Sequence, residues 1–286
     1  MKNRNKRLRV RHILLNAVLL LFLAAYIFPV LWMISSSVKS TGELFSSRIY
    51  LIPEALTLDH YREVFASYSI GDWFKNSLAT TVGIAILQIL VSFLAAFALG
   101  YYRTRLNGAV NYFLLITMVI PFQVLMYPLV RWMRVIGEFM HFRLLGTVGG
   151  IVFAYLGFGS PLSIFIFHGF IKNIPLEIEE SATIDGCPKS TVFFRIVFPL
   201  LQPIIITVLI LNGIWIWNDY LLPLLVLGSN GRVQTIPIAV TAFAGAYLKQ
   251  WDLILTSTLI AMLPIIVLYI FAQRYIIKGM VEGSIK

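Results

Sequence analysis

The sequence is short of charge, of cysteine and of nucleotide-binding motifs. Only 13% of its 286 residues are charged, against about 25% in a typical soluble domain. Its single cysteine, Cys187, excludes an intrachain disulfide, and no cluster of cysteine and histidine suggests a metal site. No phosphate-binding loop of the form G-x-x-x-x-G-K-[ST] occurs, so we do not expect the chain to hold ATP itself.

Hydrophobic residues are abundant instead. They make up 59% of the chain, and the mean hydropathy is +0.84. The formal net charge of +10 is spread over the ends of apolar blocks rather than gathered in one patch. Membrane insertion and the cytoplasmic lipid surface explain such a distribution better than nucleic acid does. We therefore predict an integral membrane protein in contact with lipid and with no nucleic-acid partner.

Six stretches are long and apolar enough to cross a membrane, which takes about 20 residues of helix. They are residues 13–34, 74–100, 109–130, 147–170, 196–211 and 253–272. The first follows a basic segment, residues 1–12, but its 22 positions exceed the apolar core of about 7–15 residues in a signal peptide. We expect that span to be kept, and the fold class to be an all-α membrane protein with six transmembrane helices.

Lysine and arginine set the expected orientation, because they are enriched in cytoplasmic loops. With the N-terminus inside, 14 of the 23 Lys and Arg residues fall on the cytoplasmic side. Both termini are then cytoplasmic. The predicted organisation is a basic N-terminus (1–12) and a transmembrane domain (13–286). That domain has external segments at 35–73 and 228–251, a cytoplasmic loop at 171–195 and a cytoplasmic tail at 273–286.

The region 196–227 is too long for one span and too interrupted for two. We predict one span followed by a broken or re-entrant piece, which is tolerated at membrane depth only inside protein or along a cavity. Asn218 and Asp219 either line a transport pathway or satisfy the broken backbone. Gln88 in the second span and Gln123, two residues after Pro121 in the third, are further pathway candidates.

The loop 171–195 is more structured than a simple connector should be. Pro175 can open a helix, and carboxylates then fall in its first turns. Ser181 and Ala182 leave a shallow surface, and Gly186 permits a left-handed turn before a second short helix. This bent pair of helices could transmit force from another protein, but the pattern is equally typical of an amphipathic helix lying at the membrane interface.

The same loop carries a spaced set of residues: Glu180-Ser181-Ala182, Gly186 and Ile196-x-Phe198-Pro199. This set resembles the EAA signature (EAA-x3-G-x9-I-x-LP) of importer permeases in the ATP-binding-cassette superfamily. The resemblance implies the type I importer permease fold and a loop that docks on a separate ATPase. Its coupling residues would be Glu179, Glu180, Ser181, Ala182, Asp185, Gly186, Cys187 and Pro199.

Two further segments resemble carbohydrate-importer permeases. Trp217-Asn218-Asp219-Tyr220 is similar to a segment that follows the fifth span there, and residues 273–286 resemble the tail of the second permease of maltose-type and multi-sugar systems. That tail normally ends in a glycine beyond the lysine, which is missing here. The resemblance implies that the loop 228–249 reaches a binding protein and that the tail contacts the ATPase through Lys278, Gly279, Gly283 and Lys286.

The family resemblance implies a non-enzymatic permease subunit of the bacterial cytoplasmic membrane that imports a sugar such as an oligosaccharide. Its partners would be a homologous second permease, two ATPase subunits that use ATP and Mg²⁺, and an extracytoplasmic solute-binding protein. The chain itself would bind no cofactor. An importer for an amino acid, phosphate or metal is the alternative. A secondary transporter fits less well, because no predicted span has a Lys, Asp or Glu in its central part.

Overall fold

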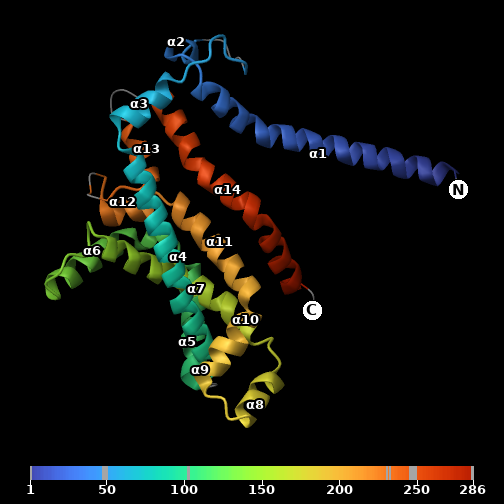
Figure 1. Ribbon diagram of the computed structural model, residues 1–286, viewed down its shortest axis with the longest axis vertical. Coiled ribbons are helices and arrows are strands. Elements are labelled where there is room, and N and C mark those ends of the chain that lie inside the picture. Colours follow the sequence, from blue (N-terminus) through green and yellow to red (C-terminus); the bar gives the residue numbers. More distant parts are fainter. Residues whose placement is uncertain are drawn as a thin grey trace. The chain divides into compact units, whose positions relative to one another are not determined.

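The computed structural model describes residues 2–46, 51–101, 104–229, 231, 233–244 and 250–284. The long regular elements in this part of the chain are helices, as predicted (Figure 1). The chain divides into two compact units, Met1–Ile70 with Val240–Met262 and Gly71–Ala239 with Leu263–Lys286. In chain order the helices are α1 (Lys2–Ser37), α2 (Thr41–Leu44), α3 (Asp59–Ser67), α4 (Ile70–Tyr101), α5 (Arg105–Val119), α6 (Phe122–Phe139), α7 (Val148–Ile171), α8 (Leu176–Ile184), α9 (Lys189–Thr191), the π-helix η1 (Val192–Val197), α10 (Phe198–Leu200), α11 (Gln202–Asn218), α12 (Leu221–Leu227), α13 (Ile236–Ala242) and α14 (Trp251–Ser284).

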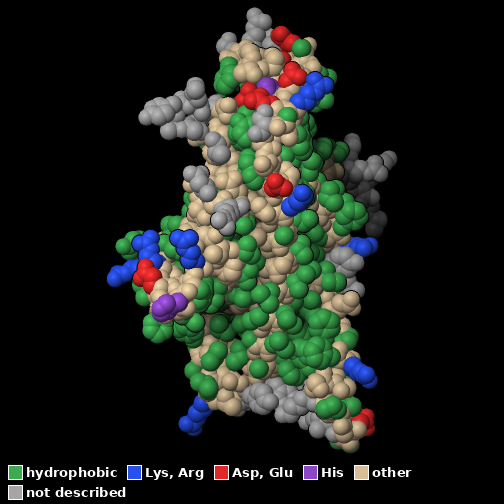
Figure 2. All heavy atoms as spheres, turned by 60° about the vertical axis from the view of Figure 1, so that its left-hand side comes forward, with side chains coloured by type: hydrophobic (Ala, Val, Ile, Leu, Met, Phe, Trp, Pro, Cys, Tyr) green, Lys and Arg blue, Asp and Glu red, His purple; other side chains and the backbone are tan. Residues whose placement is uncertain are grey.

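Four of the described helices are long and apolar enough to cross a membrane singly, and six spans result if each of two bent helix pairs counts as one. This number agrees with the six predicted spans. Between sparse charged side chains, hydrophobic side chains form broad patches on the surface visible in Figure 2. An apolar surface of this extent is stable in lipid and not in water.

The first unit contains α1, which is apolar on all sides after its basic first turns. The most apolar window of its membrane-length stretch, His12–Ser37, has no residue buried against other described residues, and only the serines at its end, Ser35, Ser36 and Ser37, are buried. Exposed side chains occur around the whole helix, from Leu14 to Tyr26 and Trp32. Lipid or another subunit must therefore cover this helix.

In the same unit, α3 turns a partly polar face inward. Val64 is fully buried, whereas Phe65 is 61% exposed. The buried position next to Val64 belongs to His60, whose Nε2 lies 2.9 Å from the carbonyl oxygen of Lys39. Its Nδ1 lies 3.6 Å from the carboxylate of Asp252 at the start of α14. Polar contacts, rather than apolar spacing, thus decide which face of α3 turns inward.

The second unit is built on α4, α7 and α11, which bury two apolar clusters. One contains Phe93, Phe167 and Val197 near the end of the unit that carries α8. The other contains Tyr155 and Leu222 near α12 (Figure 1). The loop before η1 and the break before α12 therefore lie at opposite ends of the same long helices.

The predicted third span, 109–130, is not one straight helix. α5 ends at Val119, α6 begins at Phe122, and the two axes are bent by 107°. Pro121 causes the break: it lacks an N–H group and forces Ile120 out of the helical region, to ψ 119°. The 15 residues of α5 extend only about 22 Å, less than the hydrocarbon core of about 30 Å.

The fifth predicted span is also bent. η1 and α10 meet α11 at 71° around Leu201. α11 then ends at Asn218, where Asp219 is extended with ψ 126°, and the short α12 follows. The expected pattern of one span followed by a broken piece is therefore present, with the break at the Asn218–Asp219 pair that the sequence singles out.

Candidate functional site

The loop after α7 forms a tight helical corner. Pro175 immediately precedes α8, and the helix ends at Ile184. Gly186 follows with φ +73°, a left-handed conformation that glycine adopts without strain. The N–H of Cys187 donates to the carbonyl of Ala182 at 3.0 Å, which is the long hydrogen bond of a Schellman motif. The corner predicted at Asp185-Gly186 thus has the geometry expected of it.

An apolar anchor holds this corner against the long helices. Ala182 is only 7% exposed and belongs to the same buried cluster as Phe93 and Phe167. The Phe193 ring of η1 lies 5.1 Å from the ring of Phe93 and 4.9 Å from that of Phe97, both on α4. Because packed interiors transmit displacement rather than absorb it, a push on α8 would reach α4, α7 and α11.

The opposite side of the corner faces outward. The side chain of Ile184 is 85% exposed, the largest exposed fraction among the described large hydrophobic residues. Ser181, Asp185 and Gly186 are also exposed, and the Ser181 hydroxyl donates to the carbonyl of Glu177 at 2.7 Å. A surface that combines an exposed apolar side chain with small polar residues suits contact with a protein partner.

The other expected coupling residues fall around this corner. Glu179 and Glu180 lie in α8, although their side chains are outside the described part of the structure. Cys187 is half-buried against the anchor, and Pro199 lies in α10. Of the expected tail contacts, Lys278, Gly279 and Gly283 lie in α14, and Lys286 is outside the described residues.

The pathway candidate Gln88 lies inside the unit rather than on an exposed face. It is completely buried, and its amide nitrogen donates to the Ser163 hydroxyl at 3.2 Å. The amide of Asn212 donates to the same oxygen at 3.0 Å, and Ser163 donates to the carbonyl of Gly159 at 3.1 Å. A buried polar layer therefore joins α4, α7 and α11 between the two apolar clusters.

Ser163 and Asn212 were not among the residues expected to matter. The available signal is weak: Ser163 is an isolated polar residue within the fourth predicted span, and Asn212 directly follows the fifth in the same apolar run. Gly159 is required for this layer, because a Cβ atom there would lie 2.2 Å from the amide nitrogen of Gln88. A pathway role for Gln88 stays a prediction.

Asp219 satisfies the broken backbone after α11. Its Oδ1 accepts from the N–H groups of Leu221 and Leu222 at 3.0 and 3.4 Å, which caps α12. Its Oδ2 accepts from the hydroxyl of Tyr155 on α7 at 3.0 Å. Asn218 is exposed, and its amide donates to the carbonyl of Ile214.

Gln123, the remaining pathway candidate, is exposed in the first turn of α6, directly after the Pro121 bend. The four pathway candidates are therefore not brought together in this chain. Gln88 lies in the buried layer, Asp219 and Asn218 at the α11–α12 break, and Gln123 at the bend.

Comparison with known proteins places the chain in a family. Residues 88–282 match the model of the binding-protein-dependent transport system inner membrane component. The chain is 35% identical over 281 residues to the probable starch degradation products transport system permease protein AmyC of Thermoanaerobacterium thermosulfurigenes, with 98% of this chain and 99% of that protein covered. It is 34% identical over 263 residues to the melibiose/raffinose/stachyose import permease protein MelC of Bacillus subtilis, covering 92% of each.

Solved structures show the same fold. A chain of a bacterial ABC transporter involved in the import of the acidic polysaccharide alginate superposes with a TM-score of 0.73 at 22% identity, over 93% of this chain and 96% of that one. The same kind of transporter in complex with a pentasaccharide-bound periplasmic protein gives a TM-score of 0.69 at 15% identity, over 93% of both chains. The family model covers the polar layer, the α8 corner and the α12 cap, and the chain belongs to the family of binding-protein-dependent transport system inner membrane components.

Proposed function

We propose that this permease works in an ATP-binding-cassette importer for a sugar, with an oligosaccharide as the preferred substrate class. Its partners in this proposal are a second permease, two ATPase subunits and an extracytoplasmic solute-binding protein. The relatives support the substrate class, since one is a probable permease for starch degradation products and the other an import permease for melibiose, raffinose and stachyose. ATP and Mg²⁺ belong to the ATPase subunits, because the sequence has no nucleotide-binding loop of its own.

One observation carries the coupling step: the α8 corner is anchored on its inner side and open on its outer side. Ala182 packs into the cluster that holds α4, α7 and α11, while Ile184 projects outward with 85% of its surface exposed. In the proposal the ATPase binds this corner on the cytoplasmic side. Closure of the ATPases then moves α8, and the packed helices switch between inward and outward access as rigid bodies.

The magnitude of this contact can be stated for Ile184. Complete burial of an isoleucine side chain contributes about 1.5–3 kcal/mol, so its loss should weaken ATPase binding by roughly tenfold or more. Ile184→Asp adds the cost of burying a carboxylate. Because Ile184 packs on almost nothing within the chain, the variant should still fold and insert.

The experiment is co-purification of the chain with its second permease and ATPase from detergent-solubilised membranes, followed by uptake assays in proteoliposomes. The Ile184→Asp variant should no longer co-purify with the ATPase and should no longer support uptake. The Ile52→Asp variant should still do both. Ile52 is similarly exposed, at 81%, but lies in the segment predicted to be external. Normal ATPase binding by Ile184→Asp would refute the docking surface. Uptake of amino acids, phosphate or metal ions, but of no sugar, would refute the substrate class.

A further inference from the structure

A cavity of about 360 Å³ lies between α5 and α7 and is not used by the coupling corner or the polar layer. Its lining residues are Gly108, Asn111, Tyr112, Leu114, Leu115, Phe165, His168 and Lys172. This volume lies within the range of about 300–1,000 Å³ that is usual for small-molecule sites. The cavity lies at the end of α7 that leads into α8, the end predicted to be cytoplasmic.

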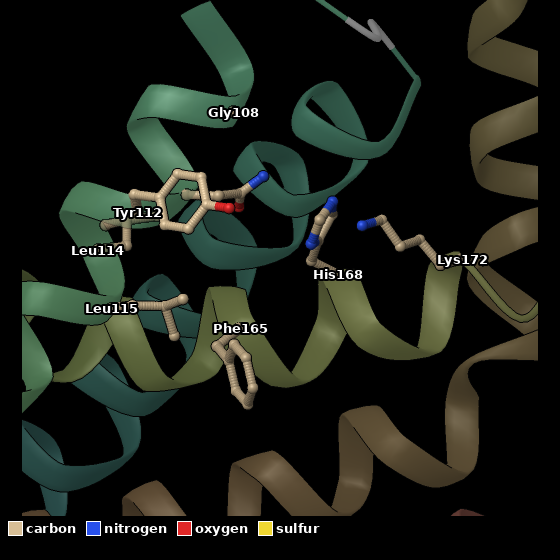
Figure 3. Close-up of a pocket in the computed structure, with 8 residues that line it drawn as sticks. Gly108, Tyr112, Leu114, Leu115, Phe165, His168 and Lys172 are labelled. Atoms are coloured by element: carbon tan, nitrogen blue, oxygen red, sulfur yellow. The ribbon is translucent and has the colours of Figure 1, made fainter. Parts of the chain in front are cut away.

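The polar groups of the cavity converge. In Figure 3 the hydroxyl of Tyr112, the ring of His168 and the ammonium group of Lys172 point into a common space. Lys172 is the C-terminal cap residue of α7 and keeps a helical conformation, so it lies on the same face as His168, four residues earlier. No acidic residue is among the described residues that line the cavity. The site therefore presents one permanent cation and one ionisable imidazole with no carboxylate beside them, which favours an anion.

The rest of the lining is apolar and opens outward. Leu115, Phe165 and Tyr112 are 38%, 52% and 71% exposed, whereas His168 at the inner end is 9% exposed. Gly100 of α4 backs the histidine, since a Cβ atom there would lie 3.7 Å from its Cδ2. A buried imidazole and an exposed ammonium group beside an outward apolar rim match a molecule that has an anionic head and a hydrocarbon tail.

We propose that this cavity binds the phosphate headgroup of an anionic phospholipid in the cytoplasmic leaflet, with an acyl chain along Leu115 and Phe165. Basic pockets between transmembrane helices on the cytoplasmic side are suited to such headgroups. Cations near the C-terminal end of α7 also complement the helix dipole, but the dipole does not account for the cavity or its apolar rim. The proposal depends on the predicted topology and not on the identity of the transported solute.

The test is native mass spectrometry of the assembled transporter, purified in detergent and supplied with phosphatidylglycerol or phosphatidylcholine. The parent should retain phosphatidylglycerol selectively. Lys172→Gln should lower its retention by about fivefold, the effect of roughly one basic residue near a membrane surface, and Lys172→Arg should restore it. Arg195→Gln removes an exposed cation of η1 outside the cavity and should leave retention unchanged.

A second variant separates a lost site from a misfolded protein. Leu115→Trp fills the apolar part of the cavity without a change of charge and should also lower retention. Equal retention of both lipids, or unchanged retention in Lys172→Gln and Leu115→Trp, would overturn the proposal. Displacement of the lipid by excess inorganic phosphate would assign the site to a soluble anion instead. Retention by the isolated permease but not by the assembled transporter would mean that a partner subunit fills the cavity, and would equally overturn it.

Discussion

The coupling of ATP hydrolysis to uptake should depend on the left-handed backbone conformation at Gly186. It should weaken stepwise as residues that adopt this conformation less readily are placed there. Its φ of +73° closes the α8 corner, and a Cβ atom built there meets nothing within 4 Å. A side chain at this position therefore causes no clash, and its cost is that of the backbone conformation alone. That cost is about 1–2 kcal/mol for an ordinary residue, smaller for asparagine and larger for a β-branched residue. Proline cannot reach this φ at all.

If the ATPase binds only the closed corner, this cost appears as weaker binding. A cost of about 1–2 kcal/mol corresponds to roughly 5–30-fold in affinity. ATPase binding and solute transported per ATP should therefore fall in the order Gly, Asn, Ala, Val, and Gly186→Pro should uncouple hydrolysis from uptake. All variants should insert normally, because Gly186 is exposed and contributes nothing to the apolar anchor.

The assay is transport and ATP hydrolysis measured together in proteoliposomes, with ATPase co-purification as a second readout. Gly71→Ala is the matched control. Gly71 is also exposed and unobstructed, but it lies in the first turn of α4 without a left-handed backbone. Equal coupling in the Gly, Asn, Ala and Val proteins would refute the argument that the corner must stay closed.

Three further substitutions test the packing of the second unit, each by the thermal unfolding midpoint in detergent. Gly159→Ala places a Cβ atom 2.2 Å from the Gln88 amide and should lower the free energy of unfolding by about 1–3 kcal/mol. The double variant with Gln88→Ala removes the clash, so strictly additive losses of stability would contradict this account. Gly150→Ala should cost more, because its Cβ atom would lie 1.9 Å from the backbone carbonyl oxygen of Leu144, and an unchanged midpoint would show that this close approach is wrong. Tyr155→Phe removes one donor to the α12 cap and should cost only about 0.6–1.7 kcal/mol, so a loss of folding would mean that the cap depends on this hydroxyl far more than its geometry indicates.

Local signals in the sequence predicted much of the α8 corner. Pro175, the following carboxylates and Gly186 act through backbone geometry and helix-end electrostatics within a few residues, and the structure has a helix and a left-handed turn where they indicate. The broken segment after α11 was predictable for the same reason, because Asn218 and Asp219 interrupt an apolar run.

Features decided by packing were not predictable in this way. The sequence indicates a kink at Pro121 but not a bend of 107°, which depends on how α6 packs afterwards. Polar residues in an apolar run cannot be sorted into pathway and interior without their neighbours, so the sequence singles out Gln88 but neither its partner Ser163 nor Asn212, which donates to the same hydroxyl. The spacing of α3 likewise could not show that His60 would take an inward position.

The most direct test of the docking surface is a cross-link from Ile184. The sequence has one cysteine, so Cys187→Ser with Ile184→Cys places a single thiol on the outer side of the corner for a photoactivated cross-linker. In the assembled transporter the adduct should be with the ATPase subunit, and its yield should change with ATP. Adducts with lipid alone, or none with the ATPase in a transporter that still imports solute, would contradict the account.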